Sequence, residues 1–458
     1  MSNRMLNAKM ARGFYPEQIL DDEPKLDKWV RCSFSRFSKA FARQSVTANQ
    51  LSAGVNRFSE KYGILSEQAL LKEVESIRAG LRTSNVDFEL VTRCFALIRE
   101  VADRRLGMRH YDVQLYGGWI LSQGMVAEMN TGEGKTLTAT LPACVAALIG
   151  LPVHIVTVND YLASRDAEWM RPIYEAFGLT VGVVMQGMDL DARRQAYDCD
   201  ITYCTNKELV FDYLKDRLVF GGKPNKGLLN LEKLSETGLR KERLLLRGLG
   251  FALVDEVDSI LIDEARTPLI ISGQGDSSYK AKVYRQALDL AGQLDEDADF
   301  ELDRLKRRLT LKDEGKQRLE HLVEEHSGFW KGKSRREELI RQALTAIHLF
   351  HKDRDYLLKD GRVQIIDEFT GRTMQDRSWE QGLHQLIETK EDCELTTQKE
   401  TLARISYQRF FRRYKCLSGM TGTAKEVANE LWSVYHLNVV SVPSHKQVVR
   451  QQWTSQIL

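Results

Sequence analysis

The residues of this chain best suited to chemistry lie at positions 129–136, Met-Asn-Thr-Gly-Glu-Gly-Lys-Thr. In a phosphate-binding loop (P-loop), backbone N–H groups surround the phosphate oxygens, and Gly132 and Gly134 leave room for that approach. A helix that begins at the end of such a loop presents the positive end of its dipole to the same anion. We therefore predict a P-loop at 129–136 that binds a nucleoside triphosphate. An ordinary strand-to-helix turn is the alternative.

Two side chains at the end of the P-loop have distinct predicted roles. Lys135 is expected to reach the β and γ phosphates, and the hydroxyl group of Thr136 is expected to ligate Mg²⁺. One position departs from the general pattern, because Met129 stands where a glycine is usual. The nucleotide-binding residues predicted within the loop are Thr131, Gly132, Glu133, Gly134, Lys135 and Thr136.

An acidic pair follows a predicted buried strand further along the chain. The apolar residues 251–254 run directly into Asp255 and Glu256. Asp255 is expected to hold the Mg²⁺ ion from the side opposite Thr136, and Glu256 to orient or deprotonate the attacking water. The predicted catalytic residues are therefore Lys135, Asp255 and Glu256. Taken alone, the acidic pair has an alternative interpretation as a solvated turn after a strand.

The composition of the chain is that of a cytosolic protein with several domains. A length of 458 residues corresponds to roughly three domains of about 150 residues each. A net charge of +2 provides no global field that would draw the chain to nucleic acid. The seven cysteines include no C-x-x-C pair, so reduced thiols are expected. The apolar stretch 137–158 is interrupted by Pro142, Gly150 and Pro152, which indicates a helix and a strand rather than a membrane span.

The pattern of elements predicts an α/β fold with a parallel sheet. Residues 1–105 are expected to form a helical extension, including a helix from Leu90 that stops at Gly107. Strands expected at 153–158, 180–184 and 201–203 are separated by helices, which indicates a parallel sheet with helices on both faces. Ligands in such folds lie beyond the carboxyl ends of the strands, where the P-loop and Asp255 are expected.

The character of the sequence changes after residue 273. Residues 274–395 are predicted to form an inserted α+β domain, in which Tyr356–Leu358 and Val363–Ile366 flank a strong hairpin signal, Asp360-Gly361. The predicted domains are the extension (1–105), the nucleotide-binding domain (106–273), the insertion (274–395) and a return to the nucleotide-binding domain (396–458). Within the last segment, residues 417–424 are interpreted as a small-residue loop. Basic residues near positions 4–12 indicate either a solvated terminus or a short helix that touches lipid.

Several motifs in this order resemble the SecA family, the ATPase motors of bacterial preprotein translocation, and the likeness covers most of residues 85–445. In addition to the P-loop, they are Gly107–Leu115, Thr157–Ala163, Asp200–Tyr203, Val254–Pro268 and Gly419–Ala424. The resemblance implies a RecA-like nucleotide-binding domain that uses ATP and Mg²⁺.

The resemblance also implies roles for individual residues. Gln114 occupies the position that reads the adenine base, and a side-chain amide can pair with two positions on that base. Asp255 and Glu256 match the Walker B pair, and Met129 is usual in this family. The segment Thr421–Thr423 matches a loop that relays the nucleotide state to moving parts; an ordinary turn is the alternative.

The insertion resembles the preprotein-cross-linking domain of the same family, through Asp367–Gln375 and Gly382–Gln385. Strands at its neck could hold an extended polypeptide through main-chain hydrogen bonds, although a purely structural hairpin is the alternative. The implied partners are unfolded preproteins and the Sec translocation channel, and the implied location is the cytoplasm and the cytoplasmic face of the inner membrane. No nucleic-acid partner is expected.

The sequence departs from the family in its residues and its length. Cys204, Lys207 and Phe369 replace the usual glycine, asparagine and histidine. Only 34 residues follow Ala424, whereas a second RecA-like domain needs on the order of 150. In the family that domain supplies arginine fingers, each worth about 10³–10⁵ in rate. We therefore expect ATP binding with weak hydrolysis by this chain alone, whether it is a fragment or a complementary chain completes the site.

Two other functions are compatible with the sequence. Half of a DEAD-box-like, nucleic-acid-dependent helicase would share the order of the motifs, but the near-neutral charge and the lack of a basic and aromatic stripe argue against it. A non-catalytic regulator that binds nucleotide would explain the lack of a second domain. The sequence leaves open whether the chain forms a homodimer.

Overall fold

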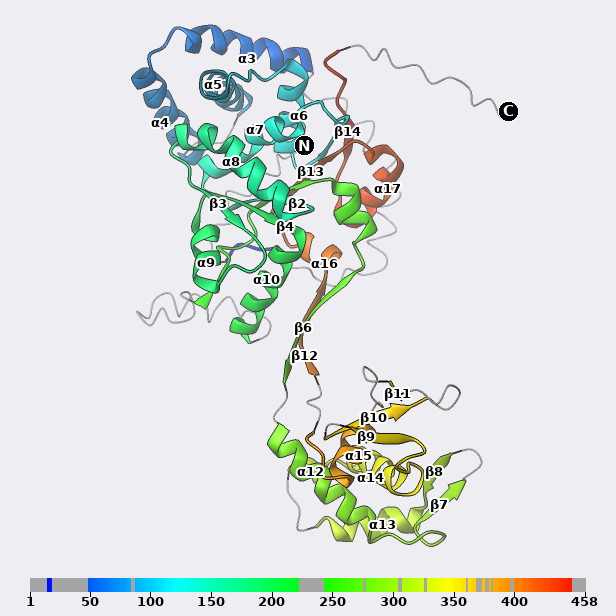
Figure 1. Cartoon of the computed structure of the whole chain (residues 1–458). Coiled ribbons are helices and arrows are strands. Elements are labelled where there is room, and N and C mark those ends of the chain that lie inside the picture. The colour runs from blue at the N-terminus through cyan, green and yellow to red at the C-terminus, as the bar shows by residue number, and fades with distance from the viewer. Residues whose placement is uncertain are drawn as a thin grey trace, which may run out of the picture. The chain divides into compact units, whose positions relative to one another are not determined.

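The computed structural model places two compact units along the chain (Figure 1). One consists of Met1–Ile271 and Leu402–Leu458, and the other of Ser272–Thr401. The residues that the structure describes are 15–18, 48–83, 87–221, 243–274, 277–303, 307–324, 328–359, 361–367, 373–374, 379, 382–395 and 399–446. The basic segment at residues 4–12 lies outside this described part of the chain.

The first unit is built on a seven-stranded sheet with the order β14-β1-β13-β5-β2-β4-β3. All neighbouring strands in it are parallel, which confirms the predicted fold class. Strands β2, β4 and most of β5 are buried along their length, as expected for a sheet covered on both faces. The strands are β1 (Val126–Glu128), β2 (Val153–Thr157), β3 (Val181–Val184), β4 (Ile201–Thr205), β5 (Phe251–Asp255), β13 (Cys416–Thr421) and β14 (Val439–Ser441).

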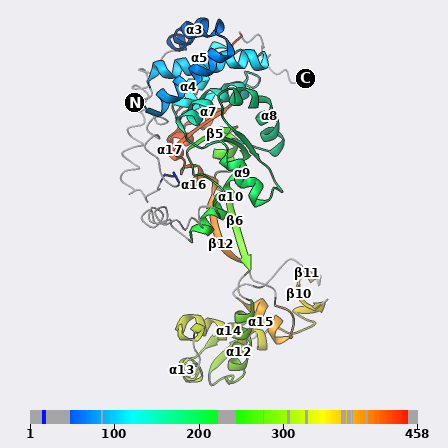
Figure 2. The ribbon, with the colours of Figure 1, turned by 90° about the vertical axis from the view of Figure 1, so that its left-hand side faces the viewer.

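Helices cover both faces of this sheet, as predicted. One face shares a core with α6 (Asp112–Ser122), α7 (Lys135–Ile149) and α8 (Asp160–Ala176). The other face shares a core with α9 (Leu190–Asp198), α10 (Asn206–Phe220), α16 (Tyr407–Phe411) and α17 (Ala424–Tyr435). The helices α3 (Ala48–Gly63), α4 (Glu67–Thr83) and α5 (Phe88–Leu106) pack on α6–α8 as an outer layer (Figure 2).

The helix predicted from Leu90 to Gly107 is confirmed as α5, and both of its ends have recognisable caps. The Asp87 carboxylate accepts a hydrogen bond from the N–H of Leu90 at 2.8 Å. Gly107 ends the helix in the left-handed conformation with φ of 65°. No helix in the described residues has the length and apolar character needed to cross a bilayer.

One structural prediction was wrong. Residues 417–421 belong to β13, a fully buried strand between β1 and β5, rather than to a loop. Small side chains at Ser418 and Gly419 are typical of loops, but here they reflect the limited space inside a sheet with neighbours on both sides and on both faces. Only Gly422 and Thr423 separate this strand from α17.

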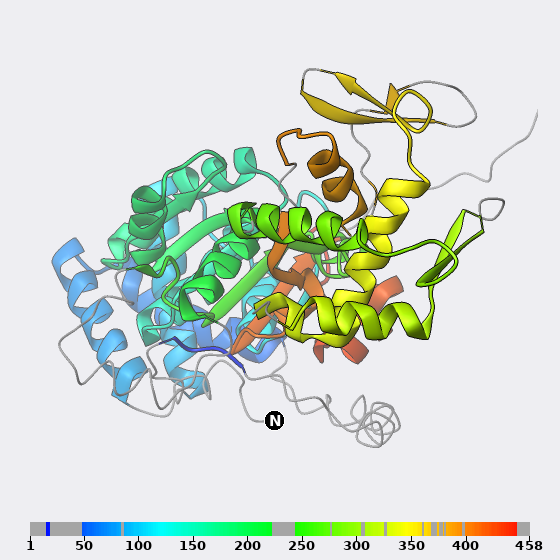
Figure 3. The same cartoon turned by 90° about the horizontal axis from the view of Figure 1, so that it is seen from below.

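The second unit is an α+β structure with its own core (Figure 3). The predicted hairpin is confirmed, because β9 (Tyr356–Lys359) and β10 (Arg362–Ile366) pair in antiparallel fashion, although Asp360 at the turn lies outside the described residues. A second hairpin joins β7 (Phe300–Asp303) and β8 (Arg308–Leu311). The other described elements are α12 (Ser277–Ala291), α13 (Asp313–Leu322), the short helix η5 (Gly328–Lys331), α14 (Lys333–His348), β11 (Thr373–Met374) and α15 (Leu383–Lys390). The connecting strands β6 (Pro268–Gln274) and β12 (Lys399–Ser406) pair with each other.

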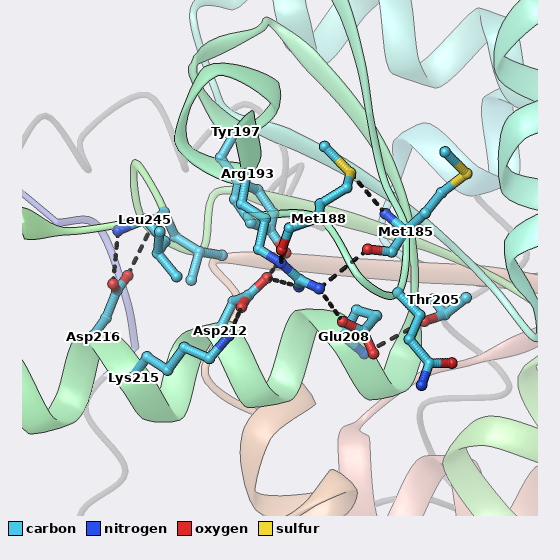
Figure 4. A network of polar contacts seen from close by, with 12 residues as sticks. Met185, Met188, Arg193, Tyr197, Thr205, Glu208, Asp212, Lys215, Asp216 and Leu245 are labelled. Carbon is cyan, nitrogen blue, oxygen red and sulfur yellow. Dashed lines mark hydrogen bonds and ion pairs between the residues drawn. The ribbon is translucent and has the colours of Figure 1, made fainter. Parts of the chain in front are cut away.

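A buried arginine joins α9, the turn before it and α10 in the first unit (Figure 4). Arg193 is only 4% exposed and donates hydrogen bonds to Asp212 at 2.8 Å and Glu208 at 2.5 Å. It also donates to the carbonyl oxygens of Met185 and Met188, both at 3.1 Å. This single guanidinium group therefore neutralises two carboxylates and fixes the chain between β3 and α9.

Replacing Arg193 with methionine is expected to destabilise the first unit by about 3 kcal/mol, because the largely buried Glu208 would lose its ion-pair partner and the buried Asp212 would keep only Lys215 and Tyr197. The control is Arg105→Met on α5, which removes an exposed pair with Glu67 and is expected to cost less than about 1 kcal/mol. Urea unfolding followed by circular dichroism measures both. Equal losses of stability for the two variants would contradict a special role for Arg193.

Candidate nucleotide-binding site

The predicted site residues converge at one edge of the sheet. The P-loop follows β1, Asp255 ends β5, and Thr421 ends β13, the strand that lies between them. Because the three strands are parallel and adjacent, their carboxyl ends place these segments side by side.

The P-loop has the predicted strand–loop–helix form. It begins with the buried Met129 and ends where α7 starts at Lys135. Gly132 and Gly134 have φ angles of 89° and 78°, in the left-handed region that favours glycine. Thr136 lies in the first turn of α7, where backbone N–H groups have no partner within the helix. This geometry suits an anion at the start of α7.

An ion pair connects the P-loop to the acidic pair. The Nζ atom of Lys135 lies 2.7 Å from Oε1 of Glu256. The other carboxylate oxygen of Glu256 accepts a hydrogen bond from the Thr421 hydroxyl at 3.4 Å. Glu256 also has a φ angle of 52°, a conformation that is costly for a side chain other than glycine and occurs often at functional sites. Phosphates arriving at the P-loop would therefore compete with Glu256 for the charge of Lys135.

Asp255 lies next to this ion pair and is partly buried. Burial raises the pKa of Asp255 to about 6; the positive charge of Lys135 counteracts this rise, and the negative charge of Glu256 adds to it. At neutral pH the carboxylate is therefore mainly ionised. Together with the Thr136 hydroxyl, it offers the hard oxygen ligands that Mg²⁺ prefers.

Gln114 joins α6 to the P-loop. Its Oε1 atom accepts a hydrogen bond from the N–H of Tyr111 at 2.9 Å, and its Nε2 atom donates to the carbonyl oxygen of Glu133 at 2.9 Å. A side-chain amide has two donor hydrogens and two acceptor lone pairs, so one of each remains for a ligand. A Cβ atom at Gly134 would lie 2.3 Å from Nε2 of Gln114, so this contact requires glycine.

The segment Thr421–Thr423 contacts the acidic turn. The Thr423 hydroxyl donates a hydrogen bond to Asp258. Partial burial alone would raise the pKa of Asp258, but the hydrogen bonds from Thr423 and Thr421 hold it below its ordinary value. Thr421 also contacts Glu256, so a shift of Glu256 toward or away from a nucleotide would change the contacts of this segment.

Sequence reasoning missed three residues of this site. His110 is fully buried, and its Nε2 atom donates to the carbonyl oxygen of Leu137 in α7 at 3.0 Å. Asn130 and Tyr111 contact residues 444 and 445, far along the chain. Tyr111 and His110 stand within the motif that contains Gln114, so that motif could have pointed to them. No local signal connects residues 444 and 445 to the P-loop.

Gly419 sets the distance between β13 and the strand that carries Asp255. A Cβ atom built on Gly419 would lie 2.8 Å from the carbonyl oxygen of Val254 and 2.7 Å from a methyl group of Val257. The backbone oxygen cannot rotate away, so a larger residue would push the two strands apart. The contact between Thr421 and Glu256 depends on this close approach.

Comparison with known proteins places most of the chain in one family. Residues 34–432 match the model of the SecA DEAD-like domain. A protein translocase subunit SecA 2 of Nitrosospira multiformis is 44% identical over 463 residues, which cover 100% of this chain and 69% of that protein. A protein translocase subunit SecA 2 of Bordetella avium is 50% identical over 83% of this chain and 59% of its own length.

A protein translocase subunit SecA of Solidesulfovibrio magneticus is 45% identical and covers 87% of this chain but only 45% of its own length. The chain thus spans about half to two thirds of the length of these curated relatives. A hypothetical ATP-dependent RNA helicase from Sulfolobus tokodaii matches 36% of this chain and 44% of its own at 21% identity, with a TM-score of 0.26, a likeness too weak to bear on the function.

Gly419→Ala is expected to destabilise the protein by about 1–3 kcal/mol, because the added methyl group collides with the backbone of β5. The matched control is Ser418→Ala in the same strand. The Ser418 hydroxyl is buried and has no hydrogen-bond partner among the described residues, so its removal should be neutral or slightly stabilising. Thermal unfolding of both variants tests this; a fully stable Gly419→Ala protein would show that the strands can separate at no cost.

Proposed function

This chain belongs to the SecA DEAD-like domain family, and from that premise we propose that it binds ATP with Mg²⁺ as part of a motor for protein export. The observation that supports this most directly is the ion pair between Lys135 and Glu256, which joins the P-loop to the Walker B pair. In the proposed cycle the triphosphate takes the place of Glu256 as the partner of Lys135. Glu256 is then free to act on the attacking water.

Each predicted site residue has a place in this proposal. Lys135 binds the β and γ phosphates, and the backbone of residues 131–134 surrounds them. Thr136 and Asp255 supply oxygen ligands to Mg²⁺, the ion that bridges the phosphates and offsets their charge. Gln114 reads the adenine base with the donor and the acceptor that its contacts to Tyr111 and Glu133 leave free.

We propose that a second RecA-like domain completes the site for hydrolysis. The relatives extend well beyond the length that this chain matches. An arginine finger stabilises charge in the transition state and is worth about 10³–10⁵ in rate. ATP binding by this chain should therefore be measurable by itself, whereas rapid hydrolysis requires the complementary domain, in the same protein or in a partner chain.

The proposed substrate is an unfolded preprotein. The strands β6 and β12 form a ribbon of only two strands, so each has one edge without a neighbouring strand in the described residues. Ile270 and Leu402 on these strands are 43% and 53% exposed, respectively. An extended polypeptide could add to such an edge through main-chain hydrogen bonds, which suits substrates without a fixed sequence.

The proposed partner at the membrane is the Sec translocation channel, and the proposed location is the cytoplasm with peripheral association at the inner membrane. The family match supports a SecA-type motor rather than half of a nucleic-acid-dependent helicase. A net charge of +2 is in line with a protein substrate.

Lys135→Ala is expected to weaken MgATP binding by roughly 10- to 100-fold, because the phosphates lose a charged partner and meet the unpaired carboxylate of Glu256. Isothermal calorimetry of the purified chain measures this loss. Lys72→Ala, a change on the exposed surface of α4, is the matched control and should bind as the unmodified chain does. Equal affinities for both variants would remove Lys135 from the phosphate site.

Glu256→Gln is expected to bind MgATP at least as tightly as the unmodified chain, because the phosphates no longer compete with a carboxylate for Lys135. Hydrolysis should fall by roughly 100-fold or more, the usual contribution of a general base. The assay measures phosphate release in the presence of a chain that carries the second RecA-like domain. Glu168→Gln, an exposed change on α8, serves as the control. Unchanged turnover in Glu256→Gln would exclude Glu256 as the base.

A further inference from the structure

A short segment after β14 lies across the P-loop. We call this segment, Val442–Lys446, the latch. The N–H of Val442 donates a hydrogen bond to the carbonyl oxygen of Glu128 at 2.9 Å, just before the P-loop. The Asn130 amide donates to the Ser444 hydroxyl at 3.1 Å, and the N–H of His445 donates to the Glu133 carboxylate at 3.1 Å. Two hydrogen bonds therefore hold the latch to the P-loop, and the third continues the pairing of β14 with β1.

Near its end, the latch makes an aromatic contact close to Gln114, the residue expected to read the base. The His445 imidazole stacks on the Tyr111 ring with 3.8 Å between centroids and 18° between planes. Both residues are exposed to solvent, and Tyr111 retains 49% of its accessible surface. The two rings are therefore nearly parallel and in direct contact.

The stacked pair is connected to Gln114 through a closed series of contacts. The N–H of Tyr111 bonds to Gln114, Gln114 bonds to the backbone of Glu133, and the carboxylate of Glu133 accepts from His445. Gln114 is only 4% exposed, so a base that pairs with it would also meet the exposed residues of this series, among which Tyr111 offers an aromatic surface. In this structure the imidazole covers that surface.

We propose that the latch is an intramolecular competitor of the nucleobase, with His445 occupying the ring face of Tyr111 on which the base stacks. This proposal rests on the proposed function, because it assigns a regulatory element to the same nucleotide site. Binding of ATP would release His445 from Tyr111. The alternative arrangement holds the base between the two rings, so that His445 assists binding.

The competition should change the affinity for nucleotide by a measurable factor. When a site is open only part of the time, the apparent dissociation constant equals the intrinsic one divided by the open fraction. An exposed aromatic stack of this type corresponds to a difference of roughly two- to tenfold in affinity. The effect should be confined to ligands with a base, because the Glu133 carboxylate and the Asn130 side chain, which hold the latch, leave the backbone N–H groups of the P-loop available for phosphates.

The test compares MgATP with inorganic tripolyphosphate in magnesium buffer, each titrated by calorimetry into the unmodified chain and into His445→Ala. We expect His445→Ala to bind MgATP roughly two- to tenfold more tightly and to bind tripolyphosphate with unchanged affinity. His351→Ala, at an exposed histidine of the second unit, is the matched control and should change neither value.

Each other outcome has a definite meaning. Weaker binding of MgATP by His445→Ala would overturn the latch in favour of a base held between two rings, and an unchanged affinity would overturn it as well. If neither MgATP nor tripolyphosphate binds to either protein, the proposed nucleotide site itself fails. If both ligands bind, and His445→Ala binds them with the same affinities as the unmodified chain, the proposed nucleotide site is retained and the latch proposal is rejected.

A second measurement follows the imidazole directly. In a spectrum of the chain labelled with ¹³C-histidine, the His445 signal, identified by its loss in His445→Ala, should be shifted by the Tyr111 ring. Saturating MgATP should remove that shift, whereas tripolyphosphate should leave it in place. A His445 signal that stays shifted at saturating MgATP would overturn the proposal.

Discussion

The ammonium group of Lys135 and the carboxylate of Glu256 hold together two loops that follow different strands of one sheet. Neither loop could keep its conformation as easily without the other, because Glu256 has a left-handed backbone and Lys135 is largely shielded from water. The attraction between these two charges offsets part of the free-energy cost of the left-handed backbone at Glu256 and of the burial of Lys135. In the proposed function, this pair keeps the P-loop preformed, so that phosphate binding would replace one anionic partner of Lys135 with another instead of ordering a loose segment.

This ion pair depends on packing that lies beneath it. The P-loop helix rests on the core of one face of the sheet, whereas the turn after β5 is supported from the other face. Gly419 allows β13 to lie close enough for Thr421 to reach the carboxylate. On that other face, the buried guanidinium group of Arg193 joins the turn after β3 to the carboxylates of Glu208 and Asp212 on α10. Charge and packing thus support the site together.

The sequence predicted the features that local chemistry determines. The P-loop, the capped helix α5, the hairpin of β9 and β10 and the strand that leads to Asp255 all follow from neighbouring residues. The position of β13 does not follow from neighbouring residues. Its small residues are typical of a loop, and only the strands on either side of it explain why a strand forms there. The contact of His445 with Glu133 joins residues 312 positions apart, and no pattern along the chain records it. Arg193 was missed for the same reason, because its partners belong to another helix.

The place of β13 in the sheet bears on how this protein is made. The strand lies between β1 and β5, yet it is synthesised after both of them and after the whole second unit. A nascent chain that has left the ribosome up to residue 400 therefore carries an unpaired edge on β5 and no completed nucleotide pocket. An exposed strand edge of this kind can pair with strands of other chains and cause aggregation. Until β13 inserts between β1 and β5, the proposed ATP ligand cannot stabilise the emerging protein through this site.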